Sequence, residues 1–304
     1  MRIIFARFYG CAIQYGSHFL IMKRSIKAIY NAAYEPIADL VTYRVMPTAE
    51  APMNLLDPFI FLNHHGWQEY KPHNRGLPFG PHPHRGFETV TFIIEGDLMH
   101  KDSGGGESVI REGGIQWMNA GKGLVHAEIS SDEFKQQGGP LEILQLWINL
   151  PAKYKMTQPF YTGLQQEDIP TVYLDEEQKV KLYAISGDWK GTKGAYQPLT
   201  DIAIARINMK AISSATFTIA PEKNIFLYVV RGEIKVNGDL LQPHQIPEFN
   251  HDGEELELEA MQDSIVLLGN ATPYNEPFKA YGPFVMNTQQ EILQAYEDYN
   301  NGLF

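Results

Sequence analysis

The chain has 304 residues, 44% hydrophobic and 20% charged, which is the composition of a folded globular protein and argues against a disordered, collagen-like or coiled-coil chain. The length suggests two domains. The 25 Lys and Arg residues are outnumbered by 36 Asp and Glu residues, and the resulting net charge of −11 argues against direct nucleic-acid binding, while the single cysteine, Cys11, excludes a disulfide framework and a CxxC zinc site within one chain.

Residues 1–21 are fairly apolar and contain Arg2 and Arg7, but glycines and polar residues interrupt the apolar stretch. A secretory signal is therefore disfavoured. We interpret 1–21 as an extension that is non-native or disordered, with Met22 rather than Met1 as the start of the protein. No run of about 18 apolar residues is present, so the sequence predicts no membrane span. The single cysteine agrees with a cytoplasmic location.

Beyond Lys27 the sequence alternates between short apolar runs and turn residues. The runs are rich in β-branched and aromatic residues and are too short for typical helices, which favours strands. The clearest runs are residues 89–94, 143–148, 202–207 and 226–230. Turns recur about every 8–12 residues, and Asn237-Gly238 is typical of a two-residue hairpin because both positions need positive φ. The pattern predicts an all-β sandwich or barrel fold.

Two later segments break this pattern. Residues 149–170 contain three prolines and lack strand alternation, so we interpret them as the connection between two β domains. Residues Thr288–Glu291 form a capping-box sequence, apolar residues follow at helical spacing, and Gly302 lies just beyond them. This predicts a short C-terminal helix that packs on the outside of a barrel.

The segment with the clearest chemistry contains His82 and His84. Residues two apart on a strand point to the same face, and Pro83 between them restrains the backbone. His126 and Glu128 repeat this spacing. If the two strands lie side by side inside a barrel, three imidazoles and one carboxylate meet at a common point.

Such a ligand set predicts a first-row transition metal. Imidazole mixed with carboxylate favours Fe(II), Mn, Ni, Cu or Zn over Ca and Mg, which prefer oxygen ligands. Four protein ligands on an octahedral ion leave two positions open, so an organic substrate and dioxygen could be held together. A closed structural zinc site has no such open positions.

Several runs of the sequence resemble a known family. Gly76–Gly96 carries His82, His84 and Glu88 at the spacing of the first cupin motif, and Gly123–His126 resembles part of the second. Longer runs are similar to the pirin family: Leu56–Phe59, His82–Val90, Gln116–Gly123, His126–Glu128, Leu144–Leu150 and Tyr281–Thr288. The resemblance extends from about Lys27 to Gly302.

The resemblance implies an all-β chain of two cupin (jelly-roll) barrels in tandem with a short C-terminal helix. It implies a metal-binding barrel over residues 22–160 and a metal-free barrel with the terminal helix over residues 161–304. By position in the pirin motifs, the metal ligands are His82, His84, His126 and Glu128. Glu88, the position of the carboxylate ligand in typical cupins, then either supports the ligands from behind or belongs to the barrel wall.

Pirin-like proteins are associated with quercetin 2,3-dioxygenase activity, which opens a flavonol ring with O2 and releases carbon monoxide. The resemblance therefore implies a dioxygenase with one divalent metal, for which we favour Fe(II) over Mn, Ni, Cu and Zn. We expect Glu128 to accept the flavonol proton as catalytic base, and Phe79 and Gln145 to line the substrate pocket. The alternative is a metal- or redox-responsive regulatory protein that binds a transcription factor or a metabolic enzyme. A third interpretation is an isomerase or hydrolase on the same barrel.

The remaining histidines are interpreted as structural. Four of them are expected at the surface or in turns: His64, His65, His73 and His100. His64 is the expected exception, because residues 63–73 resemble a loop insertion at the mouth of the pocket. His244 and His251 lack the His-x-His spacing, so the second barrel is expected to bind no metal.

Overall fold

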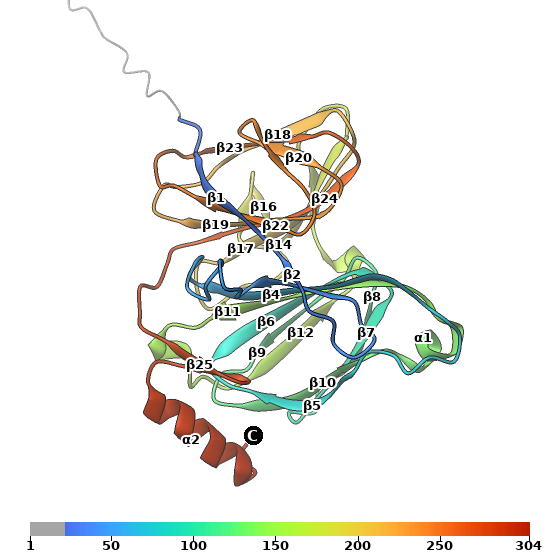
Figure 1. Cartoon of the computed structure of the whole chain (residues 1–304), viewed down its shortest axis with the longest axis vertical. Coiled ribbons are helices and arrows are strands. Elements are labelled where there is room, and N and C mark those ends of the chain that lie inside the picture. Colours follow the sequence, from blue (N-terminus) through green and yellow to red (C-terminus); the bar gives the residue numbers. More distant parts are fainter. Residues whose placement is uncertain (1–21) are drawn as a thin grey trace, which may run out of the picture.

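The computed structural model of the protein describes residues 22–304, and the expected extension 1–21 lies outside the described residues. Two β-barrels, each made of two antiparallel sheets, are stacked on one another, and the barrel built mainly from the N-terminal half is the lower one in Figure 1. The predicted fold class, two jelly-roll barrels in tandem with a short C-terminal helix, is confirmed. None of the helices in the described part of the chain is long and apolar enough to cross a membrane.

The first barrel consists of a seven-stranded and a four-stranded sheet. In sheet order, the seven strands are β12 (Phe160–Leu164), β9 (Ile115–Asn119), β6 (Phe87–Glu95), β11 (Gly139–Asn149), β4 (Phe59–Tyr70), β3 (Thr42–Met46) and β2 (Ala33–Tyr34). The four facing strands are β5 (Phe79–His84), β10 (Leu124–Ile129), β7 (Asp97–Asp102) and β8 (Glu107–Arg111). A short helix, α1 (Asp132–Gln137), connects β10 to β11 and begins after Ser131, whose side chain accepts a hydrogen bond from the Phe134 amide.

The second barrel repeats this plan with five and four strands. The five strands are β13 (Thr171–Tyr173), β14 (Val180–Ser186), β17 (Ala203–Met209), β24 (Ser264–Ala271) and β19 (Asn224–Arg231). The four strands are β18 (Ser213–Thr218), β23 (Glu255–Ala260), β20 (Ile234–Val236) and β21 (Asp239–Leu241). A small separate hairpin is formed by β15 (Asp188–Trp189) and β16 (Thr192–Lys193). The predicted hairpin between β20 and β21 is confirmed, with positive φ angles of 51° at Asn237 and 98° at Gly238.

The structure adds a strand to the predicted connection between the barrels and shows that one expected loop is wrong. The segment 149–170 contains two 3₁₀ turns, Ala152–Tyr154 and Gln166–Asp168, and also the strand β12, which pairs with β9. Its alternation is weak because β12 is an edge strand and has no fully buried residue. The expected loop insertion at 63–73 is mostly strand, because β4 continues to Tyr70 and pairs with β11 as far as Gly139.

Each end of the described chain packs on the barrel formed by the other half. Near the N-terminus, β1 (Ile26–Asn31) pairs with β22 (Gln245–Phe249) of the second barrel. At the C-terminus, β25 (Lys279–Tyr281), β26 (Phe284–Met286) and α2 (Gln289–Asn300) lie beneath the first barrel in Figure 1.

The C-terminal segment makes specific contacts with the first barrel. The Val285 amide donates to the Arg85 carbonyl oxygen at 3.0 Å, and Val285 shares a core cluster with Ile60 and Phe87. The capping box predicted for α2 is present, since Thr288 and Glu291 each accept a hydrogen bond from the other's backbone amide. The two barrels therefore do not correspond to a simple division of the chain at residue 160, because each one includes a segment from the opposite end.

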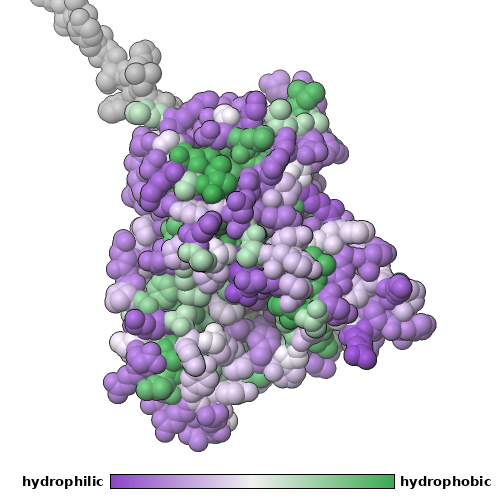
Figure 2. Space-filling view, viewed as in Figure 1, coloured by the Kyte–Doolittle hydropathy of each residue, from purple (hydrophilic) through white to green (hydrophobic). Residues whose placement is uncertain are grey.

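The two barrels differ in what fills them. The second barrel is filled with apolar side chains from both sheets, including Leu182, Ile207, Leu227 and Leu258. A second apolar core joins the barrels, because alternate residues of β6 and β11, such as Val90 and Leu146, pack against the outer face of the five-stranded sheet. Most of the molecular face drawn in Figure 2 is hydrophilic, with hydrophobic residues in separate small patches.

The interior of the first barrel is apolar in one part, where Ile93, Leu98 and Ile110 cluster, and polar in the rest. The buried side chains there include Asn63, His65, Thr91, Gln116 and Glu128. Buried polar groups are retained only where they are hydrogen-bonded or have another partner. The first barrel is therefore the place to look for chemistry.

Candidate metal centre

Strands β5 and β10 bring three imidazoles together. His82 and His84 share one face of β5, and His126 on β10 lies directly opposite His82 in the antiparallel register. One ring nitrogen from each of the three histidines lies within 4.8 Å of those of the other two, and the ring centroids are 4.4–5.0 Å apart. His84 and His126 are buried, whereas His82 is partly accessible. The convergence predicted from the two His-containing motifs is therefore present for the three imidazoles.

In each ring Nδ1, the nitrogen that points away from the other two histidines, has a partner. Nδ1 of His82 lies 2.7 Å from the Gly80 carbonyl oxygen, and Nδ1 of His84 lies 3.3 Å from the Pro283 carbonyl oxygen. A carbonyl oxygen can only accept, so both rings carry their proton on Nδ1 and have a lone pair on Nε2. Nδ1 of His126 lies 3.5 Å from Nδ1 of His100.

The inner nitrogens have no such partner. Nε2 of His84 and Nε2 of His126 are both buried without a hydrogen-bond partner among the described residues. Two orphaned lone pairs at one point are unfavourable unless a cation or a donor occupies the space between them. The donor set therefore fits a divalent transition metal.

Burial also keeps two of the rings in the form that binds metals. Desolvation lowers the pKa of His84 to about 3 and the pKa of His126 well below its usual value, and the neighbouring imidazoles add to both effects. Both rings are therefore neutral near pH 7. Neutral imidazole is the form that coordinates a metal ion.

Glu128 lies beside the three imidazoles and is held by side chains of the other sheet. Its Oε2 atom is 3.9 Å from Nε2 of His126. Thr91 Oγ1 donates to Oε1 at 3.0 Å, Gln145 Nε2 donates to Oε2 at 2.5 Å, and Gln116 also donates to Oε1. These three donors fix an acceptor-only carboxylate next to the histidines. Coordination by Glu128 as a fourth ligand stays a prediction.

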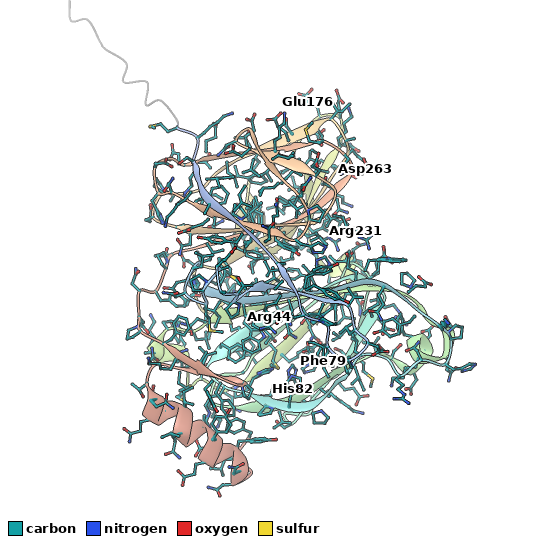
Figure 3. All side chains as sticks on the ribbon, in the orientation of Figure 1. Arg44, Phe79, His82, Glu176, Arg231 and Asp263 are labelled. Atoms are coloured by element: carbon teal, nitrogen blue, oxygen red, sulfur yellow. The ribbon has the colours of Figure 1, made fainter. Side chains whose placement is uncertain are left out.

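The two expected pocket residues lie on different strands around Glu128. Gln145, on β11, contacts the carboxylate directly, and its Oε1 atom accepts a hydrogen bond of 3.0 Å from the Trp147 indole. Phe79, on β5, is paired with Glu128 in the strand register, and its ring centroid lies 5.3 Å from that of His65. Figure 3 shows Phe79 and His82 in the same barrel. Their role as pocket residues stays a prediction.

Glu88 points away from the three imidazoles. It shares the face of β6 that carries Val90 and Phe92 into the core between the barrels, and its Oε1 atom accepts a hydrogen bond of 3.0 Å from Asn119. Burial raises the pKa of Glu88 to about 7. Of the two expectations for this residue, the structure matches the barrel-wall position.

The expectation for the other histidines was wrong for three of the four. His64, His65 and His100 are buried, and only His73 is exposed. His64 lies on the face of β4 toward the second barrel rather than at a pocket mouth. Its Nδ1 atom is 2.9 Å from the Tyr228 hydroxyl, and its Nε2 atom is 3.0 Å from Glu142 Oε1. The physical reason for His64 is that β4 pairs with β3 on one side and with β11 on the other, so this residue lies in a central strand and not in a loop.

Sequence reasoning also missed residues that support the site. Nε2 of His100 lies 2.8 Å from Asp102 Oδ2, so an Asp102–His100–His126 series runs behind one imidazole. His100 and Asp102 have the same i, i+2 spacing as the histidine pair, which is a signal that could have been used. Pro283 had no such signal, because it contributes a backbone carbonyl from nearly 200 positions along the chain.

Comparisons with known proteins agree with this architecture. The family model described as "Pirin" matches residues 40–148, and the model described as "Pirin C-terminal cupin domain" matches residues 204–304. A Pseudomonas aeruginosa protein named "Putative quercetin 2,3-dioxygenase" is 36% identical over 283 residues, covering 93% of this chain and 99% of its own. A pirin-like protein of Caulobacter vibrioides is 38% identical over 266 residues, covering 86% of this chain and 91% of its own.

Solved structures show the same likeness. A quercetin 2,3-dioxygenase from Acinetobacter baumannii has a TM-score of 0.87 and 33% identity, covering 93% of this chain and 99% of its own. A bacterial pirin from Escherichia coli in complex with nickel(II) has a TM-score of 0.63 at 21% identity, covering 81% of this chain and 99% of its own. At that identity the second likeness concerns the fold alone.

Proposed function

Since the chain belongs to the pirin family, we propose that it is a metal-dependent dioxygenase that opens the ring of flavonols such as quercetin with O2 and releases carbon monoxide. The observation that carries this proposal is the pair of buried, unpartnered Nε2 atoms of His84 and His126, which face His82 beside the Glu128 carboxylate. Relatives named for quercetin 2,3-dioxygenase activity support the choice of reaction.

The proposed metal ligands are His82, His84, His126 and Glu128. We favour Fe(II), with Mn, Ni, Cu and Zn as the other ions that suit imidazole and carboxylate ligands. A bound ion would supply a Lewis acid for the flavonol oxygen and a path for electrons between the substrate and O2.

The protein's own residues bind the substrate and accept its proton. Glu128 takes the proton of the flavonol hydroxyl at a carboxylate oxygen, which makes the substrate an electron-rich anion. Gln145, which donates to Glu128 Oε2 at 2.5 Å, holds the carboxylate in place. Trp147 next to it, whose ring packs between those of Phe61 and Phe87, offers an aromatic edge to the flavonol rings. The apolar core behind β6 and β11 excludes water from that side of the site.

The test combines metal analysis with an aerobic assay. The purified full chain is expected to contain about one divalent ion, and with quercetin it should consume O2 and release carbon monoxide. His82→Ala should lose both bound metal and ring cleavage, and Glu128→Ala should lose ring cleavage. His73→Ala is the matched control. It changes an exposed histidine that is not a proposed ligand, and it should behave as the wild type.

Full ring cleavage in the metal-loaded His82→Ala or Glu128→Ala variant would contradict the proposal. Bound metal with negligible turnover across a panel of flavonols would favour the regulatory role that the family resemblance also implies. In that case a partner protein should be retained in a manner that depends on the redox state of the metal.

A further inference from the structure

Three side chains form a row across neighbouring strands on the inner face of the first barrel. Arg44 lies on β3, Phe61 on β4 and Trp147 on β11, which are adjacent in the sheet. The Arg44 guanidinium carbon lies 4.5 Å from the centre of the Phe61 ring. The Phe61 ring stacks on Trp147 with centroids 4.2 Å apart and an interplanar angle of 16°. The row is thus a stack, with the Phe61 ring between the Arg44 guanidinium and the Trp147 ring and a positive charge at one end.

The other end of the row reaches the candidate metal centre. The Trp147 ring meets His84 edge to face, with centroids 5.4 Å apart. Its indole nitrogen donates to Gln145, which in turn donates to Glu128. Trp147 and Gln145 are only half-buried although both belong to the inner face of the sheet, so part of each side chain is accessible to solvent.

Among the described residues, no carboxylate lies within ion-pair distance of the Arg44 guanidinium. Nε donates to Asn63 Oδ1 at 2.6 Å, and no other hydrogen bond of this guanidinium exists among residues 22–304. The acidic residue that most affects Arg44 is Glu35, yet no ion pair forms between them. Arg85 and Arg231, by contrast, each have a carboxylate within 2.7 Å.

A half-buried guanidinium without a counter-charge is unfavourable unless a ligand supplies the opposite charge. Burial lowers the pKa of Arg44, but an arginine remains charged near pH 7. The planar fork of its two remaining nitrogens matches a carboxylate or an ionised phenol. Figure 3 shows Arg44 in the same barrel as Phe79 and His82.

We propose that Arg44 binds an anionic group of the substrate, so that the substrates of this site are planar aromatic anions that extend along the row from Trp147 to Arg44. The reacting end of such a molecule would be next to Gln145 and Glu128, and its carboxylate or ionised phenol would be at Arg44. This inference rests on the proposed function for the location of the reacting end. The binding of the anion itself can be tested separately from turnover.

The experiment compares two probes of equal shape and different charge on the metal-loaded full chain. The probes are 2-naphthoate, a planar aromatic carboxylate, and 2-naphthamide, its neutral counterpart, and their affinities are measured by titration calorimetry. The wild type should prefer 2-naphthoate by about tenfold, as one charge-assisted hydrogen-bonded pair predicts. Any contribution from the metal is shared by all variants with equal metal content, so the change in preference on substitution reports on Arg44.

Arg44→Gln should abolish this preference, and Arg44→Lys, which keeps the charge without the planar fork, should retain only part of it. Lys181→Gln is the matched control, because Lys181 also rests on an aromatic ring, 5.0 Å from the centre of Tyr183, but belongs to the second barrel. It should keep the wild-type preference. An equal preference in wild type and Arg44→Gln, or no preference in the wild type, would overturn the inference.

Ionic strength gives a second measurement that needs no variant. The preference of the wild type for 2-naphthoate should decrease between about 0.05 and 0.5 M salt, because salt screens the interaction of the anion with a partly accessible guanidinium. A preference that does not change with salt would contradict the role of Arg44. If the charge preference is present but flavonols are not cleaved, only the dioxygenase proposal fails.

Discussion

At the residue scale, two histidines of the candidate metal centre are oriented by backbone carbonyl oxygens and the third by a side chain. His82 uses a carbonyl oxygen two residues away on its own strand, and His84 uses the Pro283 carbonyl of the C-terminal segment. His126 uses the His100 side chain, which is itself fixed by Asp102 at 2.8 Å. Such outer partners fix the tautomer and the ring orientation of a metal ligand.

The His100 contact leads to a prediction for metal affinity. Substitution of His100 by Phe should weaken metal binding by about 10–100-fold, because the His126 ring loses the partner of its outer nitrogen. Phe keeps a flat ring that can still stack on Tyr161, whose centroid lies 3.8 Å from that of His100. The affinity is measured by competition with a chromophoric chelator.

The exposed His73 offers the control, since His73→Phe should leave the affinity unchanged. Unaltered metal affinity in a folded His100→Phe variant would show that His100 only fills space. Asp102→Asn should also lower the metal affinity, because an amide nitrogen in place of Oδ2 cannot accept from His100, while the amide oxygen can still accept from the Gly104 and Gly106 amides.

The spacing of the sequence was sufficient to predict which three imidazoles converge, because i, i+2 alternation on a strand is a local property. It could not predict what holds Glu128. Thr91, Gln116 and Gln145 come from three different strands, and only the register between those strands brings them to the carboxylate. The same holds for Arg44, since its row depends on the pairing of β3, β4 and β11.

At the element scale, the C-terminal segment holds the strand that carries His82 and His84. Arg85, which follows His84, pairs with Asp298 of α2 at 2.7 Å, and its guanidinium carbon lies 4.4 Å from the centre of the Phe304 ring. Buried Lys155 joins the same two segments, since its Nζ donates to the carbonyl oxygens of Gly86 and Val285. The segment thereby keeps the Pro283 carbonyl at His84.

This arrangement predicts that loosening α2 weakens metal binding. Asp298→Asn removes the charge partner of Arg85, which is only 5% exposed, so the C-terminal segment should detach more often. We expect faster amide hydrogen exchange over residues 279–304 and a several-fold loss of metal affinity. Hydrogen exchange by mass spectrometry and chelator competition are the two measurements.

Glu297→Gln is the control for this prediction, because Glu297 is the neighbouring acidic residue, is exposed, and forms no ion pair among the described residues. It should change neither measurement. Faster exchange in Asp298→Asn with unchanged metal affinity would refute the idea that the segment supports the metal centre.

Local sequence signals were sufficient for the elements themselves. The capping box at Thr288 and the Asn237-Gly238 turn fix their element ends through contacts between residues at most a few positions apart. They contain no information on the partner of α2, and the same limit applies to β1, whose partner β22 lies more than 200 residues away. The sequence did not show that β4 continues to Tyr70. Its inner face carries polar residues, because this part of the barrel interior is polar, so the apolar alternation typical of a strand is missing.

At the scale of the whole molecule, the two barrels share one apolar core. It contains Val90 and Leu146 from the first barrel and Ile204 and Tyr228 from the second. The shared burial couples the barrels, so we expect them to unfold together rather than one at a time. Composition could suggest two domains, but which sheet faces meet in this core depends on long-range packing.

Glu88 is a buried carboxyl group near this shared core. Its pKa is raised to about 7 from 4.5, chiefly by desolvation, although Asn119 and Trp117 partly oppose this effect. The titratable groups that face it are Tyr196 and Tyr274. Burial raises the pKa of both tyrosines, so both remain neutral while Glu88 titrates.

The raised pKa of Glu88 predicts how the stability of the molecule depends on pH. The folded protein keeps the Glu88 proton up to about pH 7, whereas the unfolded chain loses it near pH 4.5. The contribution of this group is therefore fully present below pH 4.5 and is lost as the pH rises through 7. The loss amounts to about 3 kcal/mol of the free energy of unfolding, since one pH unit corresponds to about 1.4 kcal/mol.

Glu88→Gln isolates this contribution, because the amide oxygen can still accept the hydrogen bond from Asn119 but the side chain does not titrate. Urea unfolding of both proteins between about pH 4.5 and 8.5 should give similar stabilities at the acidic end and a more stable variant at the alkaline end. All other titrating groups are common to the two proteins, so their effects cancel in the difference. If the stabilities of wild type and variant run parallel over this range, Glu88 is not the buried acid that makes the packing of the two barrels sensitive to pH.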